Sequence, residues 1–416
     1  MQLAHKIRLN PTNKQTTNFK KACGISRLAW NWGIAHWEVQ YKDGLKPSGM
    51  GLKKEFNAIK KEQFPYTYEV TKYACQQPFI QLQEAWKKYF TYLKIKKGPK
   101  VGRPKFKKKG KSKDSFYIGG DQIIIKNRTV KIPNLGYVRL EEDIRFQGKI
   151  TSATISRQAD NWFISFAIEP LISFIPCKNQ ASVGVDVGSK ALVTLSNGIQ
   201  VEAPKPLKKS IRKLKRLSRQ LSKKVHSRKK GDTTPKSKNY IKQQVKVAKH
   251  HARVSNIRKD TLHKVSTFLT DSFQYIAIED LNIKGMMANG KLARTISDLG
   301  LYELRRQLEY KSKLKGNILT FADRWFPSSK TCSYCGNIKS DLKLSDRTYH
   351  CEACGLSIDR DLNASINLER LNKIPQVLRE FTTVEMTALL TRNGLVSSIV
   401  ESVNKHQPNL IVSRVG

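Results

Sequence analysis

Two closely spaced pairs of cysteines constrain the fold of this chain more than any other feature of its sequence. The first pair is Cys332-Ser-Tyr-Cys335 and the second is Cys351-Glu-Ala-Cys354, with fifteen residues between them. A glycine follows each pair, as is typical of a knuckle whose backbone amides face the thiolates. Two such knuckles form a zinc ribbon, in which four thiolates complete a tetrahedral site and leave no position for water. We therefore expect a structural Zn²⁺ rather than a catalytic one.

The charge of the chain indicates a polyanionic partner. Lys and Arg number 77 against 33 Asp and Glu, which gives a formal net charge of +44 over 416 residues. Solubility alone requires far less than this. With 39% hydrophobic residues and six tryptophans, the chain can still build the cores of roughly two or three domains.

The remaining cysteines and the apolar runs indicate the compartment. Cys23, Cys75 and Cys177 are scattered along the chain, and an odd number argues against a disulfide framework, so we expect reduced core residues. The sequence shows no signal peptide and no apolar run approaching ~18 residues. We therefore expect a cytoplasmic protein, associated with the nucleoid, that does not engage a membrane.

The N-terminal part of the chain has the pattern of a strand followed by helices. Residues 5–9 alternate like a strand, and Asn10-Pro11-Thr12 ends this strand with a helix N-cap signal. A second helical stretch, at 70–93, is expected to break or kink at Pro78. The first helix carries an apolar face formed by Phe19, Cys23, Trp30, Ile34 and Trp37.

Two polar segments of this part are candidates for nucleic-acid contact. Tyr73, Gln76 and Gln77 lie near Lys72 and could contact base edges in a DNA groove, although an ordinary solvated helix face explains them equally well. Residues 94–113 hold eleven Lys or Arg and no acid, and their Gly and Pro residues predict a loop. Such a run is usually a solvated linker. Its interleaved Phe106 favours contact with a phosphate backbone.

Residues 122–170 change to a period of two. We expect these residues to form the hairpins of a small antiparallel β-barrel. Residues 5–9 would add a strand to it, so that the helices within 13–92 would be an insertion. The expected strands are 129–132, 137–140, 150–156 and 162–168.

A strongly basic block occupies residues 205–264, with 22 Lys or Arg against only Asp232 and Asp260. Apolar residues keep heptad spacing on both sides of a turn-like segment at 231–237. This pattern predicts an antiparallel helical hairpin that is basic on its outer faces. A solvated coiled coil is the alternative, and the scarcity of acids disfavours it. The expected contact residues are Leu207, Ile211, Leu214, Leu221, Val225, Ile241, Val245, Ala248 and Ala252.

Three carboxylates fall at the ends of otherwise apolar elements. Asp186 ends the strand-like run at 183–186, and Glu279 follows the strand-like run at 273–278. Asp361 lies in Asp-Arg-Asp-Leu-Asn-Ala, at the start of a helical pattern. Each has an ordinary alternative: Asp186 could cap a turn, the adjacent Asp280 could replace Glu279, and Asp361 could be a helix N-cap.

Taken together, the three acids are what a two-metal nuclease needs. Each Mg²⁺ takes hard oxygen ligands and keeps several waters. One ion lowers the pKa of the attacking water while the other stabilises the leaving 3′ oxygen. In a chain of charge +44, the set predicts a metal-dependent nuclease in an α/β domain.

The sequence resembles the TnpB family, the RNA-guided endonucleases of insertion sequences and relatives of type V CRISPR effectors. The resemblance covers roughly residues 1–372. Family members usually carry a second Ala after the Asp-Arg-Asp-x-Asn-Ala motif, where this chain has the similarly small Ser365. The matching segments are 183–190, 278–282, Phe-Pro-Ser-Ser-Lys-Thr-Cys at 326–332, 359–364, and the basic loop ending in Gly-Arg-Pro-Lys-Phe-Lys-Lys-Lys.

The resemblance implies an architecture. A split RNase H-like (RuvC) nuclease would comprise 181–327 and 356–372, with the zinc ribbon at 328–355 inserted in it and the basic hairpin at 205–264 within it. A wedge β-barrel, 1–12 and 114–180, would hold an inserted helical recognition region at 13–113. Residues 373–416 would be a dispensable C-terminal tail.

The resemblance also implies site residues and partners. Asp186, Glu279 and Asp361 would bind two Mg²⁺ and catalyse. A guide RNA from the transposon end would pair with double-stranded target DNA, while the protein reads a short flanking motif. Oligomeric state stays open, and a non-catalytic DNA-binding accessory of transposition or an RNA-binding protein are the rival functions. The expected nucleic-acid contacts are Lys72, Tyr73 and Gln76 for the motif, and Arg103, Lys105, Lys107, Arg212, Lys213, Arg216 and Arg219 for RNA and its heteroduplex.

Overall fold

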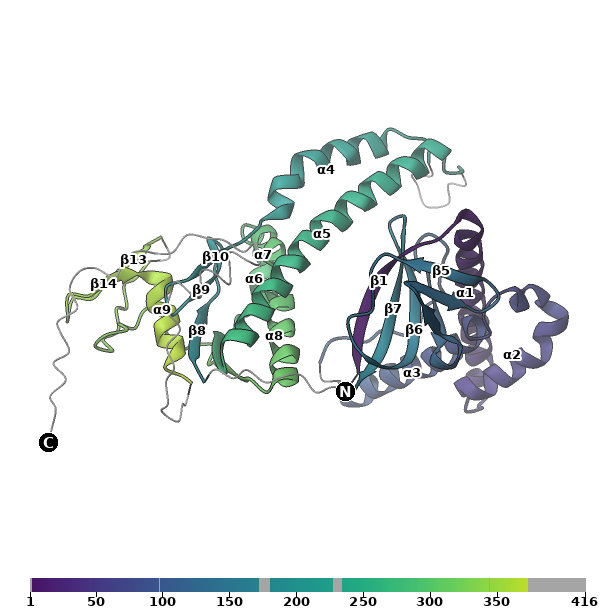
Figure 1. Cartoon of the computed structure of the whole chain (residues 1–416), viewed down its shortest axis with the longest axis horizontal. Coiled ribbons are helices and arrows are strands. Elements are labelled where there is room, and N and C mark those ends of the chain that lie inside the picture. The colour runs from purple at the N-terminus through teal and green to yellow at the C-terminus, as the bar shows by residue number, and fades with distance from the viewer. Residues whose placement is uncertain (1, 97, 172–179, 227–233, 344, 373–416) are drawn as a thin grey trace. The chain divides into compact units, whose positions relative to one another are not determined.

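The chain forms two compact units, residues 1–173 and 174–416. The computed structural model describes residues 2–96, 98–171, 180–226, 234–343 and 345–372 (Figure 1). The predicted tail, Cys177 and residues 231–233 of the predicted turn at 231–237 lie outside these residues. No helix in the described ranges has the length and apolar content of a membrane span.

The first unit is built on an antiparallel sheet of seven strands. Its order is β2-β6-β7-β1-β5-β4-β3, so the N-terminal strand is part of the sheet, as predicted, and lies between β7 and β5. The strands are β1 (Leu3–Asn10), β2 (Ser115–Gly119), β3 (Ile124–Lys126), β4 (Thr129–Ile132), β5 (Gly136–Leu140), β6 (Gly148–Gln158) and β7 (Asn161–Pro170).

The sheet differs from the predicted barrel. Among the described strands, hydrogen bonding ends at β2 on one side and at β3 on the other. After β2 the chain enters the short 3-10 helix Gly120–Gln122 instead of pairing onward. A Cβ at Gly120 would lie 2.5 Å from the Ile150 carbonyl oxygen. A period of two predicts strands and their buried faces but not closure, which requires hydrogen bonds between the two edge strands.

Helices pack against this sheet and share its core. They are α1 (Asn13–Lys42), α2 (Gly49–Gln63), the 3-10 helix Pro65–Glu69 and α3 (Tyr73–Ile95). Thr12 caps α1 in a capping box with Gln15, and the predicted apolar face is buried. Of the predicted break or kink at Pro78, the break is wrong, because α3 runs through this residue as one helix. Proline removes one amide donor, and the burial of Phe79, Leu82 and Trp86 holds the turns that follow.

The second unit has a five-stranded mixed sheet of order β10-β9-β8-β11-β12. Strand β11 pairs in parallel with β8 and β12, whereas β9 is antiparallel to β8 and β10. The strands are β8 (Ser182–Asp186), β9 (Ala191–Leu195), β10 (Gln200–Glu202), β11 (Tyr275–Glu279) and β12 (Ile318–Ala322). The helices are α4 (Pro206–Ser222), α5 (Lys238–Ser272), α6 (Ile283–Ala288), α7 (Ala293–Leu299), α8 (Leu301–Lys315) and α9 (Arg360–Glu369). A ribbon hairpin, β13 (Thr348–His350) and β14 (Ser357–Asp359), precedes α9.

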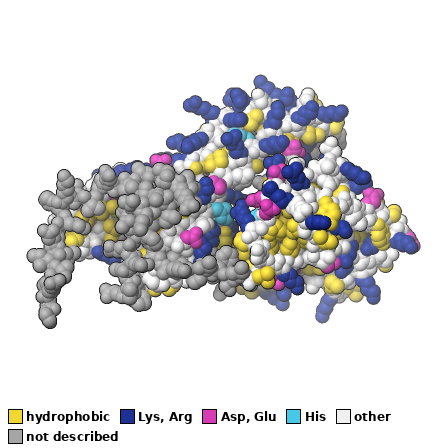
Figure 2. Space-filling model, viewed as in Figure 1, with side chains coloured by type: hydrophobic (Ala, Val, Ile, Leu, Met, Phe, Trp, Pro, Cys, Tyr) yellow, Lys and Arg dark blue, Asp and Glu magenta, His cyan; other side chains and the backbone are white. Residues whose placement is uncertain are grey.

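Helix α4 and residues 238–264 of α5 form the predicted hairpin, which we call the arm (Figure 1). Lys and Arg side chains gather over it (Figure 2). Its apolar contact is thinner than predicted: Leu214 is buried, but Val225 and Ile241 are 62% and 48% exposed. Heptad spacing predicts which side chains can meet, whereas a two-helix arm has too few neighbours to bury all of them.

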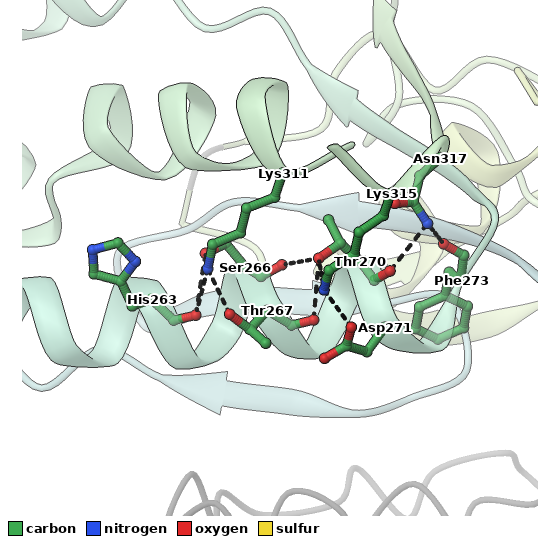
Figure 3. A network of polar contacts seen from close by, with 9 residues as sticks. All are labelled: His263, Ser266, Thr267, Thr270, Asp271, Phe273, Lys311, Lys315 and Asn317. Atoms are coloured by element: carbon green, nitrogen blue, oxygen red, sulfur yellow. Dashed lines mark hydrogen bonds and ion pairs between the residues drawn. The ribbon is translucent and has the colours of Figure 1, made fainter. Parts of the chain in front are cut away.

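Polar contacts join the arm to helices α7 and α8 of the second unit. The Asp298 carboxylate of α7 accepts the Leu207 and Lys208 amides at 3.0 Å each, and thus caps α4. Further along α5, Lys311 of α8 is buried and donates to the His263 carbonyl, Ser266 Oγ and Thr267 Oγ1 at 2.9, 2.7 and 2.6 Å (Figure 3). The N-terminal part of α5 is therefore exposed and basic, and its C-terminal part is buried against α8.

Candidate active site

The four cysteines converge on one point. Their Sγ atoms all lie within 4.8 Å of one another, and the Cys332–Cys354 and Cys335–Cys351 Sγ pairs are 3.6 Å apart. Four sulfurs about 2.3 Å from a tetrahedral Zn²⁺ lie about 3.8 Å from each other, whereas a disulfide is near 2 Å. The donor set therefore fits Zn²⁺. In the described ranges no other group of Cys, His, Asp or Glu converges in this way.

The knuckle glycines have the backbone that the spacing predicted. Gly336 and Gly355 have φ of +79° and +72°, a region that favours glycine. Their amides donate to the Cys332 and Cys351 carbonyls at 3.0 and 2.9 Å. Each turn is thereby closed behind its thiolates.

The ribbon is fastened to α9 by two asparagines whose role sequence reasoning missed. Asn363 accepts the Ser333 amide at 2.9 Å and donates to the Thr331 carbonyl at 2.7 Å. Asn367 donates to the Ser328 and Thr331 carbonyls at 2.8 and 2.6 Å. Both asparagine side chains are buried. The polar residues Asn363 and Asn367 on the core face of a helix were the available signal.

The three predicted acids line one pocket of about 210 Å³, which we call the acid pocket. Asp186 ends β8, Glu279 ends β11 and Asp361 lies in the first turn of α9. Parallel strands β8 and β11 are neighbours, so their carboxyl ends meet at one edge of the sheet. Helix α9 packs against β8 and brings the third acid to the same edge.

The structure decides which aspartate caps α9. The Asp359 side chain accepts the Asp361 and Leu362 amides, both at 3.0 Å. Asp359 is therefore the N-cap, and the alternative that Asp361 serves as the cap is wrong. The carboxylate of Asp361 instead borders the pocket, where the Arg360 guanidinium lies 3.1 Å away.

The structure also decides between Glu279 and Asp280. Glu279 lines the acid pocket and accepts a hydrogen bond from Ser328 Oγ at 2.6 Å. Asp280 forms ion pairs with Arg305 and Arg324, whose hydrogen bonds and charges lower its pKa. An acid held by two arginines outside the pocket is a structural group, which leaves Glu279 for the site.

Burial and mutual repulsion act on the pocket acids. Burial, then the charges of Glu279 and Asp361, raise the pKa of Asp186 well above its ordinary value. Burial also raises the pKa of Glu279, although the Ser328 hydrogen bond opposes this. Carboxylates forced together in this way favour a bound cation, because it offsets the desolvation and the repulsion.

Close backbone packing explains the glycine of Val-Gly-Val-Asp. A Cβ at Gly184 would lie 1.8 Å from the Ser365 carbonyl oxygen and 2.4 Å from the Glu369 amide nitrogen. Helix α9 thus rests directly on β8 at this residue. Ser365 itself is buried and donates to the Leu362 carbonyl at 2.7 Å, so the hydroxyl is satisfied within the helix.

Five cations also line the acid pocket, and sequence reasoning missed them. Lys190 follows β8. Lys330, Lys343 and Arg347 come from the ribbon and its approach, and Arg360 comes from α9. Their side chains are positive groups beside a site of negative ones, as phosphate binding requires. Only the folded ribbon brings Lys343 and Arg347 to this pocket, so no local pattern marked them.

The other predicted contact residues lie on several surfaces. In the first unit, Lys72 pairs with Asp121 at 3.5 Å and the Tyr73 hydroxyl donates to Asp121 at 2.8 Å, while Gln76 is half-buried. The basic loop is anchored rather than free: Arg103 pairs with Glu38, the Lys105 carbonyl accepts from Trp30, and the Lys107 ammonium lies over Trp30. Burial lowers the pKa of Lys107. In the second unit, Arg212, Lys213, Arg216 and Arg219 are exposed on α4.

Three family descriptions match parts of the chain. Residues 176–290 match a probable transposase, residues 302–368 the TNB domain of Cas12f1-like proteins, and residues 1–46 a helix-turn-helix domain. The last segment forms strand β1 and one long helix here.

Individual proteins and one solved structure are also similar to this chain. A protein of Streptomyces pristinaespiralis named "Putative RNA-guided DNA endonuclease" is 34% identical over 371 residues, 88% of each chain. A TnpB-like protein of Acanthamoeba polyphaga mimivirus is 29% identical over 204 residues, 48% of this chain and 38% of the relative. A solved structure of CasPhi-2 (Cas12j) bound to crRNA covers 92% of this chain and 99% of its own, at 10% identity and a TM-score of 0.42. The Streptomyces relative, with the matches to the transposase and TNB descriptions, shows that the chain belongs to the TnpB family.

Proposed function

We propose that this chain is the RNA-guided DNA endonuclease of a transposable element and that it cuts phosphodiester bonds at the acid pocket. The observation that carries the proposal is the meeting of Asp186, Glu279 and Asp361, from three distant segments, in one pocket. A binding protein has no use for three half-buried acids in one pocket of a chain of charge +44. The names of the relatives support the same activity.

The chemistry assigned to the pocket is two-metal hydrolysis. Bound Mg²⁺ would supply an activated water and stabilise the leaving 3′ oxygen. Asp186, Glu279 and Asp361 would hold the ions. The three acids line one pocket, but their carboxylate oxygens are not gathered at one point as the cysteine sulfurs are, and this spacing suits two ions better than one. Ser328 fixes one Glu279 oxygen. Lys330, Lys343 and Arg347 would contact phosphate oxygens of the substrate strand.

The proposal extends to the whole architecture. The second unit would be the RNase H-like (RuvC) nuclease, 181–327 and 356–372, with a zinc ribbon at 328–355. Residues 1–12 and 114–180 would be the wedge, with the recognition region at 13–113. The arm and the basic loop would bind guide RNA and its heteroduplex. Lys72, Tyr73 and Gln76 would help to read a flanking DNA motif.

The test is Mg²⁺-dependent cutting by the chain purified with its co-expressed RNA. A duplex that matches the copurified guide should be cut, and Asp186→Ala should abolish cutting while leaving RNA and DNA binding intact. Binding without cutting by the unmutated protein would instead support a non-catalytic accessory of transposition. Gln76→Ala tests the first unit separately, since unchanged motif preference would remove that residue from motif reading.

A further inference from the structure

Two large aromatic side chains of the second unit are exposed. Trp325, in the turn after β12, is 86% exposed, and Tyr302, in the first turn of α8, is 68% exposed. Tryptophan ordinarily buries most of its large apolar area in a core or an interface. The exposure of Trp325 therefore needs a partner.

The turn that presents Trp325 is held firmly. Asp323 accepts the Trp325 amide at 2.8 Å through its side chain and the Phe326 amide at 3.0 Å through its carbonyl. Arg324 pairs with Asp280 at 3.2 Å. Phe326 packs against a small core of Ala277, Ala322 and Leu368. The tryptophan is thus displayed by fixed neighbours on both sides of it.

Residues close to each aromatic residue form ion pairs at the edge of the sheet that carries the acids. Asp280, next to Glu279, pairs with Arg324 beside Trp325 and with Arg305 of α8. Tyr302 precedes Arg305 by one helical turn, on the same face. A few residues after Trp325, Ser328 bonds Glu279, and Ser329 and Lys330 line the pocket.

The chemistry of this surface fits unpaired nucleobases. A flat exposed ring beside basic side chains offers stacking for a base and charge for its phosphate, as in proteins that bind single strands. A duplex keeps its base faces covered by stacking. Arg324 precedes Trp325 in the chain and Lys330 lines the acid pocket, so both supply positive charge to this segment.

We propose that Trp325, together with Tyr302, stacks on bases of the single-stranded DNA whose backbone enters the acid pocket, and so positions the strand for cutting. This inference rests on the proposed function for the identity of the strand. The stacking itself requires no cutting. The two statements can therefore fail separately.

The experiment uses the full chain with its copurified RNA and a single-stranded oligothymidine that carries one 2-aminopurine. Stacking on an aromatic ring quenches 2-aminopurine fluorescence, whereas phosphate contacts elsewhere on this basic protein do not. Trp325→Ala should remove most of the quenching and weaken binding of the probe by about 10-fold. Trp325→Phe should keep most of both. Tyr137→Ala, an exposed tyrosine of the first unit, is the matched control and should change neither.

The outcomes separate cleanly. Equal quenching by the unmutated chain and Trp325→Ala, or no quenching by either, would overturn the stacking site. A strand of the same length built wholly of abasic residues should bind equally to both proteins, and a 10-fold difference there would show that Trp325 acts without stacking. Quenching that depends on Trp325 in a protein that does not cut would uphold the stacking site and overturn the endonuclease.

Discussion

The acid pocket and the arm both act through charge, but they hold it in opposite ways. In the pocket, three acids from positions 186, 279 and 361 are brought together by strand order and helix packing. In the arm, basic side chains such as Arg212 and Arg216 stand exposed on successive turns of one helix. We expect cutting at the pocket to depend on each of the three acids. We expect nucleic-acid binding by the arm to depend on its total positive charge.

The two ends of α5 show the same difference inside one helix. Its arm end carries exposed lysines, and its other end receives Lys311 from α8 into a set of hydroxyl and carbonyl acceptors (Figure 3). Exposed charges of the same sign contribute in nearly the same way to the attraction of a polyanion, so one can replace another. A buried one is specific, because every hydrogen bond must be satisfied.

The largest expected effect separates two adjacent parts of the second unit. Asp186→Asn should slow Mg²⁺-dependent cutting by at least about 10³-fold, yet metal-free stability should not fall, because the change removes a repelled, buried charge. Asp280→Asn, which only loses ion pairs with Arg305 and Arg324, should cut at close to the unmutated rate. Cleavage assays and chemical denaturation measure both. If Asp186→Asn cut as fast as the unmutated chain, the acid pocket would have no part in the mechanism.

A backbone contact gives the next effect. Gly184→Ala forces α9 away from β8 and should destabilise the chain by about 1–3 kcal/mol. It should also reduce cutting, because α9 carries Asp361. Gly290→Ala is the control, since its Cβ would meet open space. Urea denaturation followed by circular dichroism should distinguish them, and equal midpoints would contradict the close packing.

The buried lysine predicts a pH dependence. Burial lowers the pKa of Lys311 to about 8, from the ordinary 10.5 of an unfolded chain. Between these values the unfolded state binds more protons, so the free energy of unfolding should rise with pH, by about 1–3 kcal/mol. Lys311→Met should flatten this rise. Lys313→Met, an exposed neighbour on α8, should retain it, and urea midpoints measured from pH 7.5 to 10.5 provide the comparison.

The smallest effects belong to the arm. A single change such as Arg219→Gln should alter the slope of log affinity against log salt for RNA by no more than about 1. Changing Arg212, Lys213, Arg216 and Arg219 together should lower the slope by up to about 4. Filter binding over a salt series would measure this. One substitution with the effect of all four would mean that the arm, like the pocket, depends on a particular residue.

Much of the framework could be predicted from local patterns. The strands that end in Asp186 and Glu279, the helix after Asp359 and the two knuckle turns all appear where spacing and periodicity indicated. These patterns are set within a few residues of the chain by backbone sterics and side-chain period. The N-terminal strand was also expected in the sheet, where it now lies between β5 and β7.

The predictions that were wrong, and the residues that were missed, depended on contacts between segments far apart in the sequence. Barrel closure was mispredicted because it is a contact between sheet edges, and the break at Pro78 because packing against α1 outweighs one lost amide donor. The cations Lys330 and Arg347 were missed because they are ordinary surface residues until the ribbon folds over the pocket.

By itself, then, the sequence determined the zinc-binding spacing, the polyanion-binding charge and the ends of the strands that carry the acids. Only the tertiary structure decided that Glu279 rather than Asp280 enters the pocket and that Asp359 rather than Asp361 caps the helix. Neighbouring carboxylates are chemically alike, so their roles are assigned by what lies across the fold: Ser328 beside one, two arginines beside the other.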